Sequence, residues 1–192
     1  MSLLLGVKNQ FCNTMTQENY QKAIKFAGEK HKNQKVPGTE SNYLLHISNV
    51  AMEILLAYNV NNNFDLDFTI QLALLHDTIE DTETSFEEIK NEFDYRIASG
   101  VLALTKNKNL SSRKEIMIDS LKRINILEKE VGMVKLADRI TNLQKPPKYW
   151  SKDKIQNYLN ESKLIREMLN DKNEFLNKRL QMKIAEYQIY TK

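Results

Sequence analysis

The feature that most constrains the fold is an apolar run that ends in a cluster of charge. Residues 70–75 are almost entirely apolar, and the seven residues that follow include His76, Asp77, Glu80 and Asp81. The apolar residues recur at helical spacing, so we expect one helix on which His76 and Asp77 are neighbours and the second acidic pair lies one turn further on. Nearby carboxylates repel each other, and a divalent cation held by His76 and Asp77 would reverse that repulsion. The segment therefore predicts half of a metal site.

Two other segments carry an isolated polar group on an apolar helical face. Asp138 interrupts residues 134–143, with Asn142 one turn further on, and His46 lies on the apolar side of an earlier segment. The apolar stripe expected around His46 consists of Leu45, Asn49, Met52 and Leu56. One such group alone is more often a hydrogen-bonded core residue than a metal ligand. The three segments together favour a shared site.

The order of these groups resembles a known superfamily. A histidine, a His-Asp pair and a distant aspartate on helices are typical of the HD superfamily of metal-dependent phosphohydrolases. The corresponding residues here are His46, His76, Asp77 and Asp138. The longer pattern, in which Glu80, Asp81 and Thr82 follow the His-Asp pair, resembles more narrowly the RelA/SpoT-type hydrolase domain and its small stand-alone relatives. This resemblance runs from residue 17 to residue 143.

The resemblance implies an activity and a role for each residue. Enzymes of this type remove the 3′-pyrophosphate from guanosine tetra- and pentaphosphate, usually with manganese. The four matched groups would hold the metal, whereas Glu80 and Asp81 would orient and deprotonate the attacking water. The residues expected to contact the nucleotide substrate are Lys35, Tyr43, Lys106, Asn142 and Lys145.

The donor types suit a catalytic metal. Two imidazoles and two carboxylates form a mixed nitrogen and oxygen set without thiolate, which favours manganese, iron or another divalent first-row ion over a cysteine-rich structural zinc site. If the ion is six-coordinate, four protein ligands leave about two positions for water or a phosphate oxygen. Catalysis at a metal requires such open positions.

The loop before the first histidine departs from the family pattern. RelA/SpoT-type domains usually carry a basic pair there and prolines on both sides of the Tyr-x-x-His motif, but only Lys35 remains of the basic group and both prolines are replaced. After Asn142, Gln144 and Lys145 stand where the family commonly has an arginine. Guanosine tetraphosphate remains the favoured substrate, and another nucleotide or phosphorylated metabolite is the alternative. A non-catalytic nucleotide-sensing domain is disfavoured, because it has no need for a complete water-activating set.

Length and periodicity predict an all-α fold. With 192 residues and 41% hydrophobic content, the chain should form a single HD-type domain, a compact helical bundle with its motifs in residues 17–147 and covering helices in residues 152–191. Five glycines and three prolines are few, and apolar residues recur at helical spacing in residues 64–75, 111–127 and 152–169. The expected helix N-caps are Thr16, Thr84 or Ser85, Ser111 and Ser151.

The charge and the cysteine content limit which partners and which cellular compartment we expect for this protein. The net charge is +3 and both signs are scattered, so we expect no nucleic-acid partner. Residues 3–5 are too short an apolar run for a signal sequence, no stretch is long enough to span a membrane, and Cys12 has no intramolecular disulfide partner, so we expect a cytoplasmic protein. His31 lies among charged residues and is expected at the surface. An apolar stripe left over on the C-terminal helices could serve a homodimer.

Overall fold

The computed structural model describes the backbone of residues 2–192 and the side chains of residues 16–192. Its helices are α1 (Ser2–Lys30), α2 (Leu44–Val60), α3 (Leu66–Leu75), α4 (Thr78–Asp81), α5 (Phe86–Glu92), α6 (Tyr95–Leu104), α7 (Arg113–Ile126), α8 (Lys129–Asn142), α9 (Lys152–Met168), α10 (Glu174–Tyr187) and the 3₁₀ helix η1 (Gln188–Thr191). The described residues pair as β-structure only at an isolated bridge between Lys35 and Asn42. The predicted all-α fold is therefore confirmed. The interpretations of residues 3–5 and of Cys12 concern side chains outside the described residues.

Polar side chains fix where several helices begin. Ser85 and Ser151 each accept a hydrogen bond from the backbone N–H three positions further on, as predicted. The cap of α7 is Ser112 rather than Ser111. The predicted helix start at Thr16 was wrong, because α1 continues through this residue.

The helix expected to carry the whole acidic cluster is broken at the cluster itself. α3 ends at Leu75, and Asp77 has φ −101° and ψ 0°, outside the helical range. The Thr78 hydroxyl donates to the Leu75 carbonyl at 2.7 Å, and His76 Nδ1 lies 2.8 Å from the Ala73 carbonyl oxygen. These side-chain bonds take up carbonyls at the end of α3. His76 and Asp77 therefore occupy a turn between α3 and α4, and the prediction of one continuous helix was wrong.

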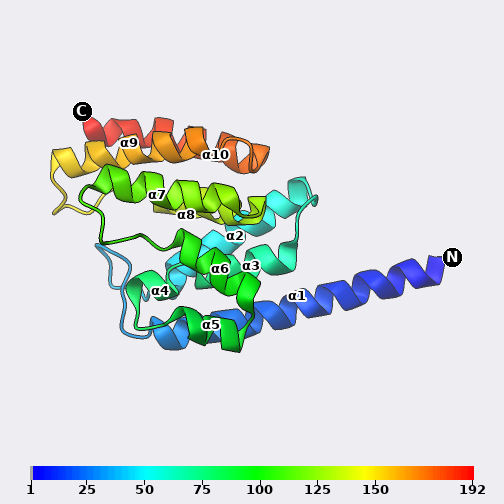
Figure 1. Ribbon diagram of the computed structural model, residues 1–192. Helices are drawn as coiled ribbons and strands as arrows, with labels where there is room; N and C mark the ends of the chain where they lie inside the picture. Colours follow the sequence, from blue (N-terminus) through cyan, green and yellow to red (C-terminus); the bar gives the residue numbers. More distant parts are fainter. Residues whose placement is uncertain (1) are drawn as a thin grey trace.

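Helix α3 lies at the centre of the molecule, in contact with α1, α2, α6 and α8 (Figure 1). Because it is covered on several sides, seven of its ten residues are buried, and its apolar run needs no polar face. Helix α8 is buried even more completely, with eleven of its fourteen residues buried, and these include Lys135, Asp138 and Arg139. Helix α8 thus brings charged residues into the interior, next to the apolar helix α3.

The buried face of α2 differs from the predicted stripe. His46 is buried together with Val50 and Ile54, whereas Met52 and Leu56 are 54% and 42% exposed. The sequence offered two apolar faces on this helix, and only packing against α3 and α8 decides which of them is covered.

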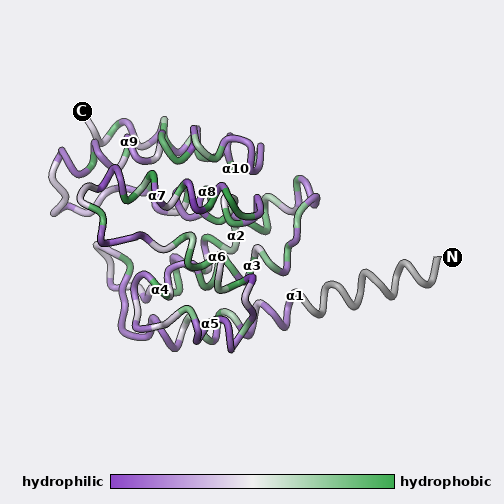
Figure 2. The backbone as a smooth tube through the Cα atoms, in the orientation of Figure 1, coloured by the Kyte–Doolittle hydropathy of each residue, from purple (hydrophilic) through white to green (hydrophobic). Residues whose placement is uncertain are grey.

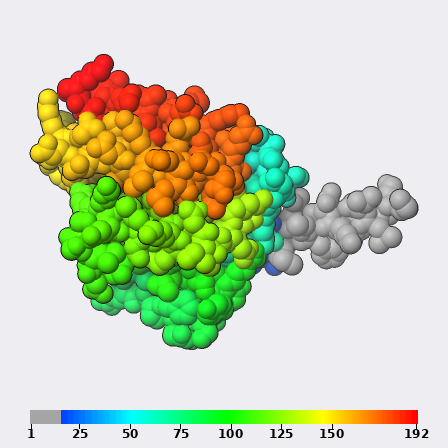
Figure 3. Space-filling view, turned by 45° about the horizontal axis from the view of Figure 1, so that its top comes forward, coloured from blue at the N-terminus to red at the C-terminus, as the bar shows by residue number. Residues whose placement is uncertain are grey.

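The two C-terminal helices cover one side of the bundle. α10 packs on α8 and α2, and α9 packs on α7, α8 and α10. Figure 2 shows hydrophobic and hydrophilic residues interleaved along α9, as in an amphipathic helix. In Figure 3 the orange and red residues of this segment form a continuous layer against the green residues of α7 and α8. None of the described helices is long and apolar enough to cross a membrane.

Candidate metal centre

Two buried histidines meet between α2 and the end of α3. His46 is 4% exposed and His76 is 2% exposed, and their Nε2 atoms lie 3.4 Å apart. His76 Nδ1 faces the Ala73 carbonyl, which can only accept a hydrogen bond, so Nδ1 carries a proton and the lone pair of a neutral His76 lies on Nε2. A backbone partner of this kind orients many metal-binding histidines.

Two aspartates complete the cluster. Asp77 Oδ2 lies 3.0 Å from His76 Nε2 and 3.8 Å from His46 Nε2. Asp138 Oδ1 lies 3.5 Å from His46 Nε2 and 3.8 Å from His76 Nε2. One ligand atom from each of His46, His76 and Asp77 lies within 4.8 Å of the other two, and Asp138 is not part of this tighter group. Each of the two aspartates nevertheless has an oxygen within 4 Å of both imidazole Nε2 atoms, so the four predicted side chains lie together.

The electrostatics of the cluster suit a cation. Burial alone would raise the pKa of Asp77 and Asp138, but positive neighbours, His76 for Asp77 and Lys135 for Asp138, hold both pKa values below their usual range. Burial lowers the pKa of His76, but the charges of Asp77 and Asp138 outweigh it and raise this pKa to about 9. Both carboxylates are therefore anionic at neutral pH, and a proton on His76 would be displaced when a cation binds.

A layer of hydrogen bonds orients the two carboxylates. The Tyr43 hydroxyl donates to Asp77 Oδ2 at 2.5 Å, and the Lys135 ammonium donates to Asp138 Oδ2 at 3.0 Å. The Asn142 amide, on the next turn of α8, donates to Asp138 Oδ1. Groups of this kind tune metal affinity as strongly as many direct ligands. The expected substrate contact Tyr43 is thus bound to a carboxylate of the cluster.

His31 belongs to this surrounding layer, and its prediction as a surface residue was wrong. It is 1% exposed, its ring lies over Tyr43 with centroids 5.0 Å apart, and its Nδ1 lies 2.6 Å from Gln34 Oε1. Burial lowers the pKa of His31. The charged neighbours in sequence concealed its position, but its spacing of four from Ala27, which is buried on the same helix face, was a signal for it.

The second acidic pair, Glu80 and Asp81, accepts hydrogen bonds from residues outside the His-Asp cluster. Glu80 Oε1 accepts from the Lys106 ammonium at 2.6 Å, and Oε2 accepts from the Lys106 backbone N–H at 3.0 Å. Asp81 Oδ2 accepts from the Gln34 amide at 2.9 Å, and burial and the charge of Asp77 raise the pKa of Asp81. Lys106, two residues beyond the end of α6, therefore fixes the orientation of Glu80.

A cavity of about 510 Å³ opens beside the cluster, with His46 in its wall. Its wall consists of Val36, Pro37, Thr39, Leu45, His46, Asn49, Thr141, Asn142, Gln144, Lys145, Pro146, Pro147, Trp150, Tyr158 and Tyr187. The predicted substrate contacts Asn142 and Lys145 lie in this wall. Lys35 does not, and its exposed ammonium is paired with Glu40. The aromatic residues from α9 and α10 were missed by the sequence analysis, because no motif links them to the cluster.

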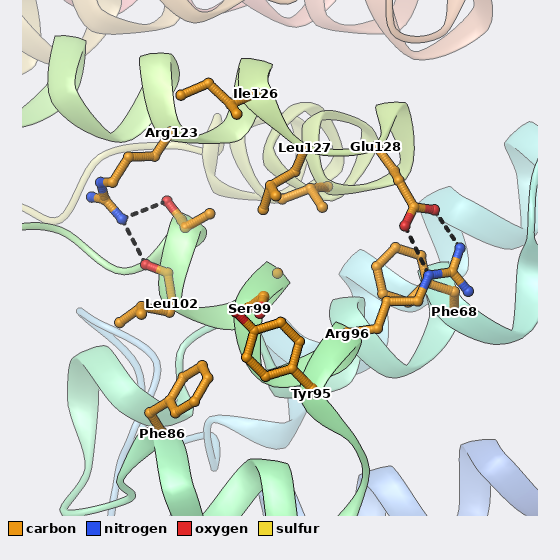
Figure 4. Close-up of a pocket in the computed structure, with 13 residues that line it drawn as sticks. Phe68, Phe86, Tyr95, Arg96, Ser99, Leu102, Arg123, Ile126, Leu127 and Glu128 are labelled. Atoms are coloured by element: carbon orange, nitrogen blue, oxygen red, sulfur yellow. Dashed lines mark hydrogen bonds and ion pairs between the residues drawn. The ribbon is translucent and has the colours of Figure 1, made fainter.

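A second cavity of the same volume is a poorer candidate for the site. Figure 4 shows its largely apolar wall, which includes Phe68, Phe86, Tyr95, Ile126 and Leu127. Both arginines among its lining residues are engaged: Arg96 pairs with Glu128, and Arg123 donates to the Leu102 carbonyl at 2.7 Å (Figure 4). No residue of the His-Asp cluster lines it. The chemistry therefore belongs to the cavity beside His46.

Comparison with known proteins places the chain in a family. A family model described as an HD domain matches residues 23–166. The chain is 31% identical over 168 residues to the guanosine-3′,5′-bis(diphosphate) 3′-pyrophosphohydrolase MESH1 of Danio rerio, covering 85% of this chain and 91% of that protein. It is 36% identical over 130 residues to the guanosine-3′,5′-bis(diphosphate) 3′-pyrophosphohydrolase of Aquifex aeolicus, covering 66% of this chain but 18% of that longer protein.

The fold agrees with these matches. A solved structure described as a metazoan ortholog of SpoT superposes with a TM-score of 0.75 at 24% identity, covering 88% of this chain and 94% of that one. The arrangement of helices is therefore that of an HD domain. The chain belongs to the HD-domain family and, within it, resembles the small stand-alone RelA/SpoT-like proteins represented by MESH1.

Proposed function

We propose that this protein hydrolyses guanosine 3′,5′-bis(diphosphate), releasing pyrophosphate from the 3′ position and leaving guanosine diphosphate. The observation that carries the proposal is the buried cluster of two imidazoles and two anionic carboxylates beside a cavity of about 510 Å³. The MESH1 relative named for this reaction matches the chain over 91% of its own length, which supports the same substrate here.

In this proposal His46, His76, Asp77 and Asp138 hold one divalent cation. When bound, the cation supplies Lewis-acid stabilisation of the charge on the phosphoryl oxygens. The nitrogen and oxygen donors and the family resemblance favour Mn²⁺. Tyr43 and Lys135 keep the two aspartates oriented, because each fills one lone pair of a carboxylate oxygen and leaves others free.

Glu80 is the proposed general base, with Asp81 beside it. The oxygen of the attacking water bonds to the phosphorus next to the 3′ oxygen, its proton passes to Glu80, and the bond from that phosphorus to the 3′ oxygen breaks. The 3′ oxygen then takes up a proton from solvent water, and Glu80 releases its proton to solvent. Both oxygens of Glu80 accept hydrogen bonds from Lys106, but each carboxylate oxygen has a second lone pair, so Glu80 can still accept the proton.

The remaining residues are proposed to contact the substrate. Asn142 and Lys145 lie in the cavity wall, where an amide and an ammonium can bind ribose and phosphate oxygens. Lys106 stands beside Glu80, close to where the pyrophosphate would leave. Contacts from Tyr43 and Lys35 stay predictions, since Tyr43 is engaged with Asp77 and Lys35 with Glu40.

The test is direct. Protein loaded with Mn²⁺ is incubated with guanosine tetraphosphate, and pyrophosphate and guanosine diphosphate are measured together, with the Asp77→Asn variant as the control for contaminating activity. Equal amounts of the two products from the wild type alone support the proposal. Cleavage of a different nucleotide, with guanosine tetraphosphate left intact, would leave only an HD phosphohydrolase of another substrate. Binding without cleavage would favour a sensing domain.

We also propose that the chain forms one domain, with the motifs in residues 17–147 and the C-terminal helices as a cover. The contacts of α10 with α2 and α8 support this, because they join the end of the chain to its centre. The cytoplasmic location, the homodimer and the absence of nucleic-acid and membrane partners stay predictions.

A further inference from the structure

The cavity beside the metal centre has one aromatic side that the proposed chemistry does not use. Trp150 and Tyr158 lie edge to face with ring centroids 5.3 Å apart, and Tyr187 lies 6.0 Å from Tyr158. All three line the cavity, and they come from the loop after α8, from α9 and from the end of α10. The C-terminal helices therefore build part of the binding site besides covering the bundle.

Two residues that line this cavity carry a buried hydroxyl oxygen with no hydrogen-bond partner among the described residues. They are Tyr187, which is 1% exposed, and Thr141, one residue before Asn142. An unpartnered buried hydroxyl costs free energy, and such groups are uncommon in folded proteins. Two of them in the wall of one cavity are explained if a ligand supplies their partners. Burial raises the pKa of Tyr187, so its hydroxyl keeps its proton at neutral pH and can donate.

The position of the reaction decides which part of the substrate can reach Tyr187. If the 3′-pyrophosphate lies at the metal centre, the base and the 5′-diphosphate extend along the cavity. The cations near the aromatic side are engaged: the Arg139 guanidinium lies 4.0 Å from the Tyr158 ring centroid, with Glu161 3.6 Å away, and the Lys154 ammonium lies over Trp150. A planar base suits aromatic rings, whereas a diphosphate suits free cations such as the exposed Lys145.

We infer that the Tyr187 hydroxyl donates a hydrogen bond to an acceptor on the purine base of the substrate, which makes Tyr187 a specificity-determining residue of this site. The inference rests on the proposed function for the placement of the 3′-pyrophosphate. It assigns base recognition to the end of α10, more than forty residues beyond Asn142.

The test compares Tyr187→Phe with Tyr190→Phe. Each change removes one hydroxyl, and the two rings pack on each other at 5.6 Å, but Tyr190 does not line the cavity. Tyr187→Phe should raise KM for guanosine tetraphosphate about 10-fold with kcat within about 2-fold, because one hydrogen bond to the substrate is lost while the reacting groups are untouched. Its melting temperature should not fall, since the free protein loses only an unpartnered hydroxyl. Tyr190→Phe should leave KM unchanged.

Calorimetric binding identifies the part of the ligand involved. Tyr187→Phe should weaken guanosine and guanosine diphosphate by the same factor and leave ribose 5-phosphate unaffected, because only the first two carry the base. Weakening of guanosine diphosphate alone would assign the contact to phosphate and overturn the inference, and so would unchanged binding of both. If the wild type releases no pyrophosphate from guanosine tetraphosphate, the proposed function fails, and the guanosine measurement still decides whether Tyr187 binds the base.

Discussion

At the scale of single residues, the His-Asp cluster places several charged side chains in the protein interior, where an unpaired charge is strongly unfavourable. Asp138 is 6% exposed and Lys135 is 7% exposed, and the two are bonded to each other on one face of α8. The anionic oxygens of Asp77 and Asp138 face the same two imidazole nitrogens. Removing one carboxylate charge would weaken the electrostatic attraction for a cation and leave the shape of the site unchanged.

Asp77→Asn should therefore abolish stable metal binding. The amide has nearly the same shape as the carboxylate but lacks its charge, and deprotonated anionic ligands are what a divalent cation requires. Metal content per chain, measured by mass spectrometry after dialysis, checks this. Asp81→Asn makes the same chemical change one turn away and should retain the metal. Unchanged metal content in Asp77→Asn would contradict its assignment as a ligand.

Glu80→Gln should keep the metal and lose rate. Glu80 is held by Lys106 and lies outside the His-Asp cluster, so its loss should lower kcat by about 10²–10⁴-fold, as expected for a general base. The exposed Glu83 provides the matched control, because Glu83→Gln removes a carboxylate from the same segment and should leave kcat unchanged. A fully active Glu80→Gln protein would make this residue structural.

At the scale of elements, helix contacts position the site residues. α6 packs against α3 at Gly100, where an added Cβ would lie 2.6 Å from Leu72 Cδ2, so the Leu72 side chain occupies the space that a side chain at position 100 would need. The segment that follows α6 then places Lys106 in hydrogen-bond contact with Glu80. The turn between α3 and α4 similarly brings Asp77 Oδ2 to 3.0 Å from His76 Nε2. The backbone of Asp77 is not helical at this turn, in contrast to the continuous helix that was predicted.

Gly100→Val should destabilise the fold. The added side chain would clash with Leu72, and overpacking of this kind costs about 1–3 kcal/mol of unfolding free energy. Chemical denaturation of the purified protein measures the loss. Ser99→Ala is the control at the adjacent position. It removes a buried hydroxyl that has no hydrogen-bond partner in the described part of the chain, so it should not lower stability. Equal stability of Gly100→Val and the wild type would show that α6 can move away from α3 at little cost.

At the scale of the whole molecule, the proposed metal centre joins the two halves of the chain. His46, His76 and Asp77 come from α2 and the turn after α3, whereas Asp138 comes from α8. A cation bound by all four would bind the folded state and not the unfolded chain. Its binding free energy would then add to stability through mass action.

Chelation should accordingly lower the melting temperature. At a metal concentration 100 times Kd, binding contributes about 2.7 kcal/mol. For a protein of this size that corresponds to about 5–10 °C. A thermal melt with and without Mn²⁺ measures the shift, and the Asp77→Asn variant should show almost none. An equal shift in both proteins would mean that the ion acts elsewhere.

The helical fold and the four residues of the His-Asp cluster could both be predicted from the sequence. Both rest on local patterns: apolar residues at helical spacing, and a short motif in which His76, Asp77, Glu80 and Asp81 are close along the chain. Spacing could not place the turn at His76, because that turn depends on side chains that bond the carbonyls of α3. The buried face of α2, the burial of His31 and the approach of Tyr187 to the cavity were decided only by the tertiary structure. These three features depend on which distant segments pack together, and the spacing of apolar residues along the sequence does not specify that packing.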